Sequence, residues 1–93
     1  MIESFRCKET QKIFHRKYSR IFPFDIQKRA YRKLVMLHSA MTLYDMKIPP
    51  SNCLEALAGK RKGKYSIRIN SQWRLCFRWT ESSAKDVEII DYH

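Results

Sequence analysis

The chain has 93 residues, of which 44% are hydrophobic, enough for one modest core and too few for two. Nineteen Lys and Arg residues against nine Asp and Glu give a formal net charge of +10. So basic a chain favours a polyanionic partner: RNA, DNA, an anionic membrane or an acidic protein. No apolar run approaches the ~20 residues that a transmembrane helix needs. We therefore expect one domain over residues 1–93 and no membrane partner.

The N-terminus and the cysteines argue for a cytoplasmic protein without a metal. The opening sequence MIESFRCKET lacks the apolar region of a signal peptide. Cys7, Cys53 and Cys76 are odd in number, far apart and form no CxxC pair. This pattern argues against both a disulfide framework and a structural zinc site.

The first half of the chain is predicted to be helical after a short opening strand at residues 2–5. Residues 9–18 have the pattern of a basic amphipathic helix. Asp25 is a suitable N-cap for a second helix, since its carboxylate can accept a bond from an unpaired backbone N–H. One face of that helix recurs at three- and four-residue steps in Ile26, Ala30, Leu34, Leu37, Met41 and Tyr44. Pro49 and Pro50 are predicted to end it.

In the second half the hydrophobic period becomes two, as in β-strands. Strands are expected over residues 64–70, 73–80 and 87–92, with compact turns at 70–72 and 81–84. Short connections between successive strands predict an antiparallel meander. The predicted fold class is therefore α+β: an N-terminal strand, two helices, and a three-stranded meander that completes one sheet.

The alternation gives this meander one apolar face and one charged face. The apolar face, which the helices can cover, holds Tyr65, Ile67, Ile69, Trp73, Leu75, Phe77, Trp79, Val87 and Ile89. The charged face carries Arg68, Arg74 and Arg78, with Lys64 near one edge. Guanidinium groups can bind phosphate oxygens through two parallel hydrogen bonds. These arginines are either the solvated side of a half-exposed sheet or a polyanion-binding surface, and the net charge favours the second interpretation.

A glycine-bracketed loop adds Lys60, Arg61 and Lys62 to the basic surface. The loop is either a solvated turn or a place where the backbone approaches a phosphate. It lacks the P-loop spacing and the Gly-Lys-Ser/Thr ending, so nothing supports nucleotide hydrolysis.

The chain ends on three groups that can carry or orient protons: Asp91, Tyr92 and His93. Metal-free RNA cleavage needs a base for the 2′-OH, an acid for the departing 5′-oxygen and a cation beside the phosphate. His93 could be the acid or the base, and Arg74 could hold the phosphate. Asp91, Tyr92 or Glu55 could orient groups or take the remaining proton transfer. Regular alternation would put Tyr92 on the arginine face and its two neighbours on the other, so a single site requires a terminal bend.

Four segments resemble the HigB-like toxins of the RelE/ParE superfamily, the toxic partners of bacterial type II toxin–antitoxin pairs. They are LEALAG at 54–59, GKYSIRIN at 63–70, QWRLCF at 72–77 and VEIIDYH at 87–93. The resemblance covers essentially the full chain, and WRLCF ahead of a terminal DYH is a specific combination. It implies a RelE-like fold and ribosome-dependent mRNA cleavage in the decoding site, with no metal or organic cofactor.

The resemblance also implies partners. They are the 70S ribosome with its mRNA and a helix-turn-helix, HigA-like antitoxin. The toxin–antitoxin complex represses its own operon, so operator DNA would be contacted only through the antitoxin.

Carried over to this sequence, the resemblance makes Arg74 the contact to the scissile phosphate. It makes Asp91, Tyr92 and His93 the terminal active-site residues. Some members have a His where this chain has Glu55, so Glu55 must substitute for it, or His93 acts alone with water and ribosomal RNA. The resemblance assigns ribosome and mRNA binding to Arg68, Arg78 and the 60–64 loop (Lys60, Arg61, Lys62 and Lys64).

Two other functions remain open from the sequence. One is a non-catalytic nucleic-acid-binding module that uses the same basic sheet. The other is a toxin of the same fold that acts on DNA gyrase.

Overall fold

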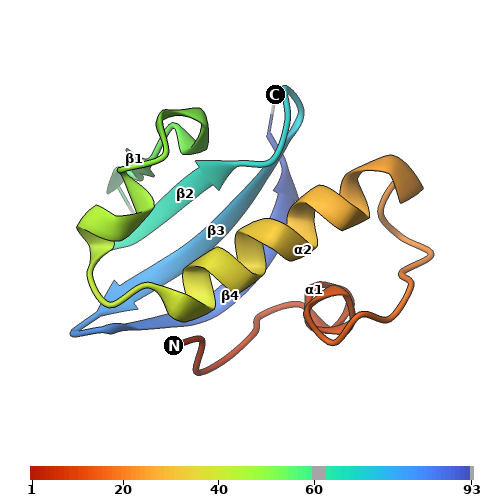
Figure 1. Cartoon of the computed structure of the whole chain (residues 1–93), viewed down its shortest axis with the longest axis horizontal. Coiled ribbons are helices and arrows are strands. Elements are labelled where there is room, and N and C mark those ends of the chain that lie inside the picture. Colours follow the sequence, from red (N-terminus) through yellow and green to blue (C-terminus); the bar gives the residue numbers. More distant parts are fainter. Residues whose placement is uncertain (60–62, 93) are drawn as a thin grey trace.

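The protein is described by a computed structural model over residues 1–59 and 63–92. The elements in chain order are α1 (Lys8–Phe14), α2 (Phe24–Ser39), η1 (Leu43–Met46), η2 (Pro50–Asn52), β1 (Glu55–Ala56), β2 (Lys64–Arg68), β3 (Trp73–Thr80) and β4 (Ser83–Asp91). Helix α2 crosses one face of the sheet, and α1 lies beside α2 near β4 (Figure 1). The α+β prediction is confirmed.

The sheet is an antiparallel meander in the order β1-β2-β3-β4. The three predicted strands are present, although β4 starts earlier than expected because a tight turn at 81–82 leads directly into it. Strand β1 is an addition that the sequence left unassigned. Its two residues, Glu55 and Ala56, pair with Ser66 and Tyr65 of β2.

The opening segment touches the sheet without forming a regular strand. It makes two isolated parallel bridges to β4, Ile2 with Ala84 and Phe5 with Val87. Between them β4 bulges at Asp86, whose φ is +52°, and the backbone N–H of Asp86 donates to Ser4 Oγ at 2.9 Å. The bulge interrupts the ladder, so the predicted strand is reduced to separate contacts along the β4 edge.

Both helices are shorter than the sequence patterns suggest. Helix α1 ends at Phe14, and Arg16 just beyond it takes φ +61°. Helix α2 starts after Pro23, which holds the N-cap position, so Asp25 lies in the first turn and makes no capping bond. Proline fits here because its fixed φ suits a helix start and no donor is lost.

The prediction that Pro49 and Pro50 end the second helix is wrong, since α2 already ends at Ser39. Thr42 and Asp45 form a capping box that starts η1 and competes with continuation of α2. Met41 is consequently 74% exposed and does not extend the apolar face.

The core lies between α2 and the helix-facing side of the sheet. The predicted helix face from Ile26 to Leu37 is buried as expected. It meets buried residues of β2, β3 and β4, which are Ile67, Leu75, Phe77, Ala84, Val87 and Ile89. The charged side chains of the strands are therefore left to the opposite face and the sheet edges. Within residues 1–59 and 63–92, no helix has the length and apolarity to cross a membrane.

Candidate functional site

Arg74 is at the centre of the candidate site and is almost completely buried. It projects from β3 on the face opposite the core, yet only 7% of it is exposed. Its Nε donates to Ser66 Oγ at 2.8 Å, and its Nη2 donates to the carbonyl oxygens of Cys53 and Ser66 at 2.6 and 3.2 Å. A guanidinium stays charged in proteins, so these acceptors compensate a permanent buried charge.

The Cys53 carbonyl reaches Arg74 because of the turn that follows η2. Cys53 takes φ +45° and ψ +55°, a left-handed conformation, and its N–H donates to Pro50 at 3.1 Å. The preceding Asn52 is fully buried: its Nδ2 donates to the Met46 carbonyl at 2.9 Å, and its Oδ1 accepts from Lys33 Nζ at 2.5 Å. This buried amide anchors the turn that supplies the carbonyl.

Two further predicted residues, Glu55 and Tyr92, meet Arg74. Glu55 Oε1 lies 3.9 Å from Arg74 Nη1, and the Glu55 side chain is 49% exposed. The Arg74 guanidinium carbon lies 5.5 Å from the centre of the Tyr92 ring, which is cation–π range. Residues from β1, β3 and the end of β4 therefore converge at one point. Tyr92 lies on the arginine face, as the alternation predicts.

Asp91 is directed elsewhere, again as the alternation predicts. It pairs with Trp73 across the ladder, and its Oδ2 accepts from Gln72 Nε2 at 3.1 Å. The next backbone N–H, from Tyr92, donates to the Gln72 carbonyl at 2.6 Å. These bonds fasten the end of β4 to the β2–β3 turn and place Tyr92 over Arg74. His93, Lys60, Arg61 and Lys62 lie outside the described residues.

The other cations of the sheet have different surroundings. Arg78 is directly opposite Lys64 and forms a 3.6 Å ion pair with Asp86, and both members of that pair are partly exposed. Arg68 is exposed and directly opposite Arg74. Of the three arginines predicted on the charged face, Arg74 is buried, Arg78 is ion-paired and Arg68 is exposed.

Sequence reasoning missed Ser66 and Cys53. Ser66 had a usable signal, because a small polar residue on the arginine face of β2 can accept from an arginine on the adjacent strand. Cys53 had none, since it contributes a backbone carbonyl whose direction depends on a left-handed residue other than glycine. Over the described part of the chain, no group of three or more His, Cys, Asp or Glu is placed to hold a metal ion.

Comparisons with known proteins identify the family and the fold of the chain. A family model described as the RelE-like toxin of the type II toxin–antitoxin system HigB matches residues 3–93. Toxin HigB-1 of Vibrio cholerae serotype O1 is 43% identical over 68 residues, which are 73% of this chain and 72% of that protein. An uncharacterized protein of Haemophilus influenzae is 34% identical over 71 residues, 76% of this chain and 69% of its own.

A solved structure shares the fold at low identity. The crystal structure of YafQ from E. coli covers 98% of this chain and 91% of its own, with a TM-score of 0.61 and 16% identity. At that identity the likeness concerns the fold alone. Membership in a type II toxin–antitoxin family implies an antitoxin partner. The family model and the Vibrio relative show that the chain belongs to the HigB-like, RelE-like toxins of type II toxin–antitoxin systems.

Proposed function

We propose that this protein is a ribosome-dependent, metal-independent mRNA endonuclease that inhibits translation and growth. The observation that carries the proposal is the buried Arg74, held by Ser66 and Cys53 with Glu55 and Tyr92 beside it. A fixed cation with acid–base groups around it matches the needs of phosphodiester cleavage by the 2′-OH.

The division of work follows from which Arg74 donors are occupied. Nε and Nη2 are bound to Ser66 and Cys53, whereas Nη1 faces the half-exposed Glu55 at 3.9 Å. Nη1 is therefore the donor that can reach a phosphate oxygen and stabilise the charge that develops there. The fixed position of the guanidinium means that little reorganisation accompanies the reaction.

Proton transfer is assigned to Glu55 and His93. One of them removes the proton of the 2′-OH, whose oxygen attacks the phosphorus, and the other protonates the departing 5′-oxygen. The products are a 2′,3′-cyclic phosphate and a free 5′-OH. Tyr92 orients the guanidinium through its ring, and Asp91 holds the end of β4 through Gln72.

The remaining basic residues are assigned to the ribosome. Lys64, Arg68, Arg78 and the loop residues Lys60, Arg61 and Lys62 would bind ribosomal RNA and mRNA phosphates. A HigA-like helix-turn-helix antitoxin would neutralise the protein in the cytoplasm, and operator DNA would be reached only through that antitoxin.

The test is primer extension on a defined mRNA incubated with purified protein, with and without programmed 70S ribosomes. We expect breaks that need ribosomes and disappear with His93→Ala. Unchanged breaks with His93→Ala would contradict its assigned role. Growth arrest without mRNA breaks would instead support action on DNA gyrase or plain nucleic-acid binding.

A further inference from the structure

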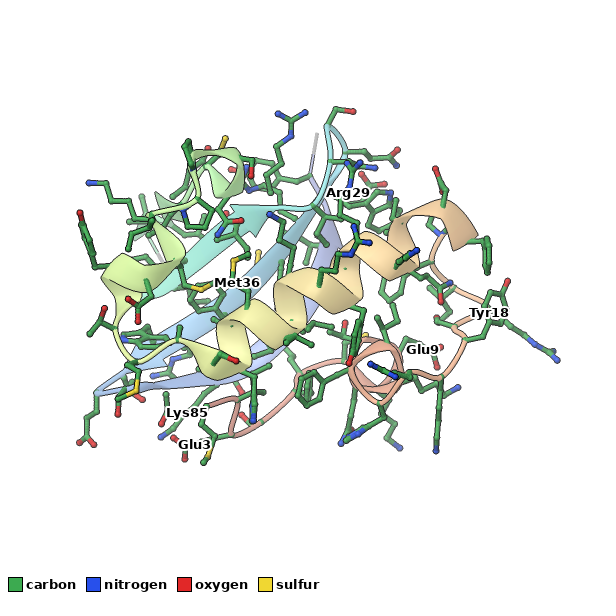
Figure 2. All side chains as sticks on the ribbon, in the orientation of Figure 1. Glu3, Glu9, Tyr18, Arg29, Met36 and Lys85 are labelled. Carbon is green, nitrogen blue, oxygen red and sulfur yellow. The ribbon has the colours of Figure 1, made fainter. Side chains whose placement is uncertain are left out.

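A second basic site lies on the other side of η2 from Arg74. A cavity of about 470 Å³ opens between α2, η2 and the end of β2. Its lining includes four cations, Arg29, Arg32, Lys33 and Arg68, together with Ser51. Figure 2 shows Arg29 and Met36, another lining residue, on the side of α2 toward β2.

Two of these cations are fixed by uncharged partners. Arg29 Nη1 donates to the Ile69 carbonyl at 3.2 Å, and Lys33 Nζ donates to Asn52 Oδ1 at 2.5 Å. Arg29 and Lys33 are four residues apart on α2, so they share a helix face, and like charges at this spacing repel. The fold therefore keeps Arg29 and Lys33 close together, and the two hydrogen bonds that hold them come from neutral groups.

The ion pairs between described residues involve cations other than these four. Within residues 1–59 and 63–92, the paired cations are Arg6, Lys12, Arg74 and Arg78. The pKa of Lys33 is lowered, first by its burial and then by the charge of Arg29. Both causes disfavour the charged ammonium, and an anion in the cavity would offset both.

We propose that this cavity binds a phosphate group of the RNA chain, at a position next to the scissile phosphate. Its cations converge on one space, Ser51 adds a hydroxyl donor, and arginine forks suit phosphate oxygens. Met36 and Ile69 give the cavity an apolar part, against which the attached ribose can pack.

The cavity is joined to the Arg74 site by neighbouring residues. Asn52 accepts from Lys33 at the cavity, and the adjacent Cys53 accepts from Arg74. Arg68, which lines the cavity, is the direct cross-strand neighbour of Arg74. One strand of RNA can therefore contact both places. The assignment of the phosphate to RNA rests on the proposed function, whereas the anion site itself does not.

The experiment measures binding of a fluorescent, fully 2′-O-methylated RNA oligonucleotide, which cannot be cleaved because it lacks the 2′-OH. Anisotropy titrations over a range of salt are compared for the wild type, Arg32→Gln and Lys28→Gln. Lys28 is on the same helix and loses the same charge, but it lines a different pocket, beside Tyr18 and Tyr31. Thermal unfolding confirms that each variant is folded.

We expect Arg32→Gln to weaken binding roughly tenfold at low salt, the size of one charged hydrogen bond. The slope of log affinity against log salt should fall by up to about 0.7, the value for one phosphate of a single strand. In the double variant Arg32→Gln/Arg68→Gln, the salt slope should fall by about 0.7 in total and not by twice that amount, because both arginines would hold one phosphate. Equal effects of Arg32→Gln and Lys28→Gln would overturn the proposal in favour of diffuse attraction.

Inorganic phosphate distinguishes the two sources of the anion. NMR signals of the arginine Nε–H groups report occupation of the cavity, and the RNA should displace inorganic phosphate from it. Inorganic phosphate that stays bound in the presence of saturating RNA would mean a free-anion site and would overturn the RNA assignment. Because this RNA cannot be cleaved, the binding result can be interpreted even if the mRNA cleavage test fails. Equal salt slopes for Arg32→Gln and Lys28→Gln would contradict the cavity proposal and leave the proposed cleavage activity untouched.

Discussion

Arg74 and Arg68 are cross-strand neighbours of the same residue type, yet they have opposite environments. Arg74 is 7% exposed and binds Ser66 and the Cys53 carbonyl, whereas Arg68 is exposed and lines an open cavity. A buried charge needs fixed acceptors, and those acceptors hold it in one position. An exposed arginine can move to meet its ligand. We therefore expect Arg74 to be a preorganised contact to the reacting phosphate, and Arg68 to contribute to RNA binding.

The sharpest way to break this comparison is to replace each arginine with lysine. Arg74→Lys keeps the charge but loses the fork that binds Ser66, Cys53 and the phosphate together. We expect cleavage of ribosome-bound mRNA to fall about 100-fold or more, as when one preorganised transition-state donor is removed. Arg68→Lys should stay within about threefold at saturating ribosome concentration, because Arg68 is assigned to RNA binding and not to the reacting phosphate.

Single-turnover cleavage rates at saturating ribosome concentration measure this effect, with circular dichroism to show that both variants fold. Equal losses for the two variants would mean that burial gives Arg74 no special role. A loss confined to Arg68→Lys would reverse the assignment and move the reacting phosphate toward the cavity.

The next expectation concerns stability. Ser66 is fully buried and accepts the Nε–H of Arg74. Ser66→Ala should lower the free energy of unfolding by about 1–3 kcal/mol, since a buried donor on a charged group loses its acceptor. The matched control is Ser71→Ala in the exposed β2–β3 turn, expected within about 0.5 kcal/mol of the wild type. Urea denaturation compares the two, and similar midpoints would show that the Ser66 bond is dispensable.

Much of the sheet could be predicted because strand alternation is a local property. The period of two correctly places Arg74 and Tyr92 on one face and Asp91 on the other. It also identifies the meander, whose turns are short. The same pattern cannot give the burial of Arg74, because the segment that covers it arrives from η2 through the left-handed Cys53.

The helix ends were predicted less well for a related reason. The apolar spacing that ends at Tyr44 is compatible with a longer helix, and Pro49 is a strong stop signal. The capping box of Thr42 and Asp45 ends the regular α-helix sooner. Periodicity describes which residues can share a face, whereas the boundary depends on local hydrogen bonds that compete with the helix.

A smaller effect is expected from the aromatic side of Arg74. Tyr92 places its ring 5.5 Å from the guanidinium carbon and is 39% exposed. Tyr92→Leu should destabilise the fold by about 0.5–1 kcal/mol through loss of the cation–π contact, while Tyr92→Phe should retain it. Thermal unfolding of both variants tests the ring, and single-turnover cleavage by Tyr92→Phe tests the hydroxyl separately. Equal destabilisation by Leu and Phe would assign the effect to the hydroxyl instead.

The smallest expected effect comes from Asp45, a charge held by neutral backbone donors at the surface instead of in the interior. The backbone N–H groups of Thr42 and Met41 donate to its carboxylate at 3.0 and 2.8 Å and lower its pKa. Because the folded pKa is the lower one, this stabilisation is present above the unfolded value of about 3.9 and is lost as the pH falls through the folded value. Asp45→Asn should therefore flatten the acid limb of stability below about pH 4. Urea unfolding of the wild type and the variant across this pH range measures the effect. A limb as steep in Asp45→Asn as in the wild type would show that neutral hydrogen-bond partners fix a charge effectively only when it is buried, as Arg74 is.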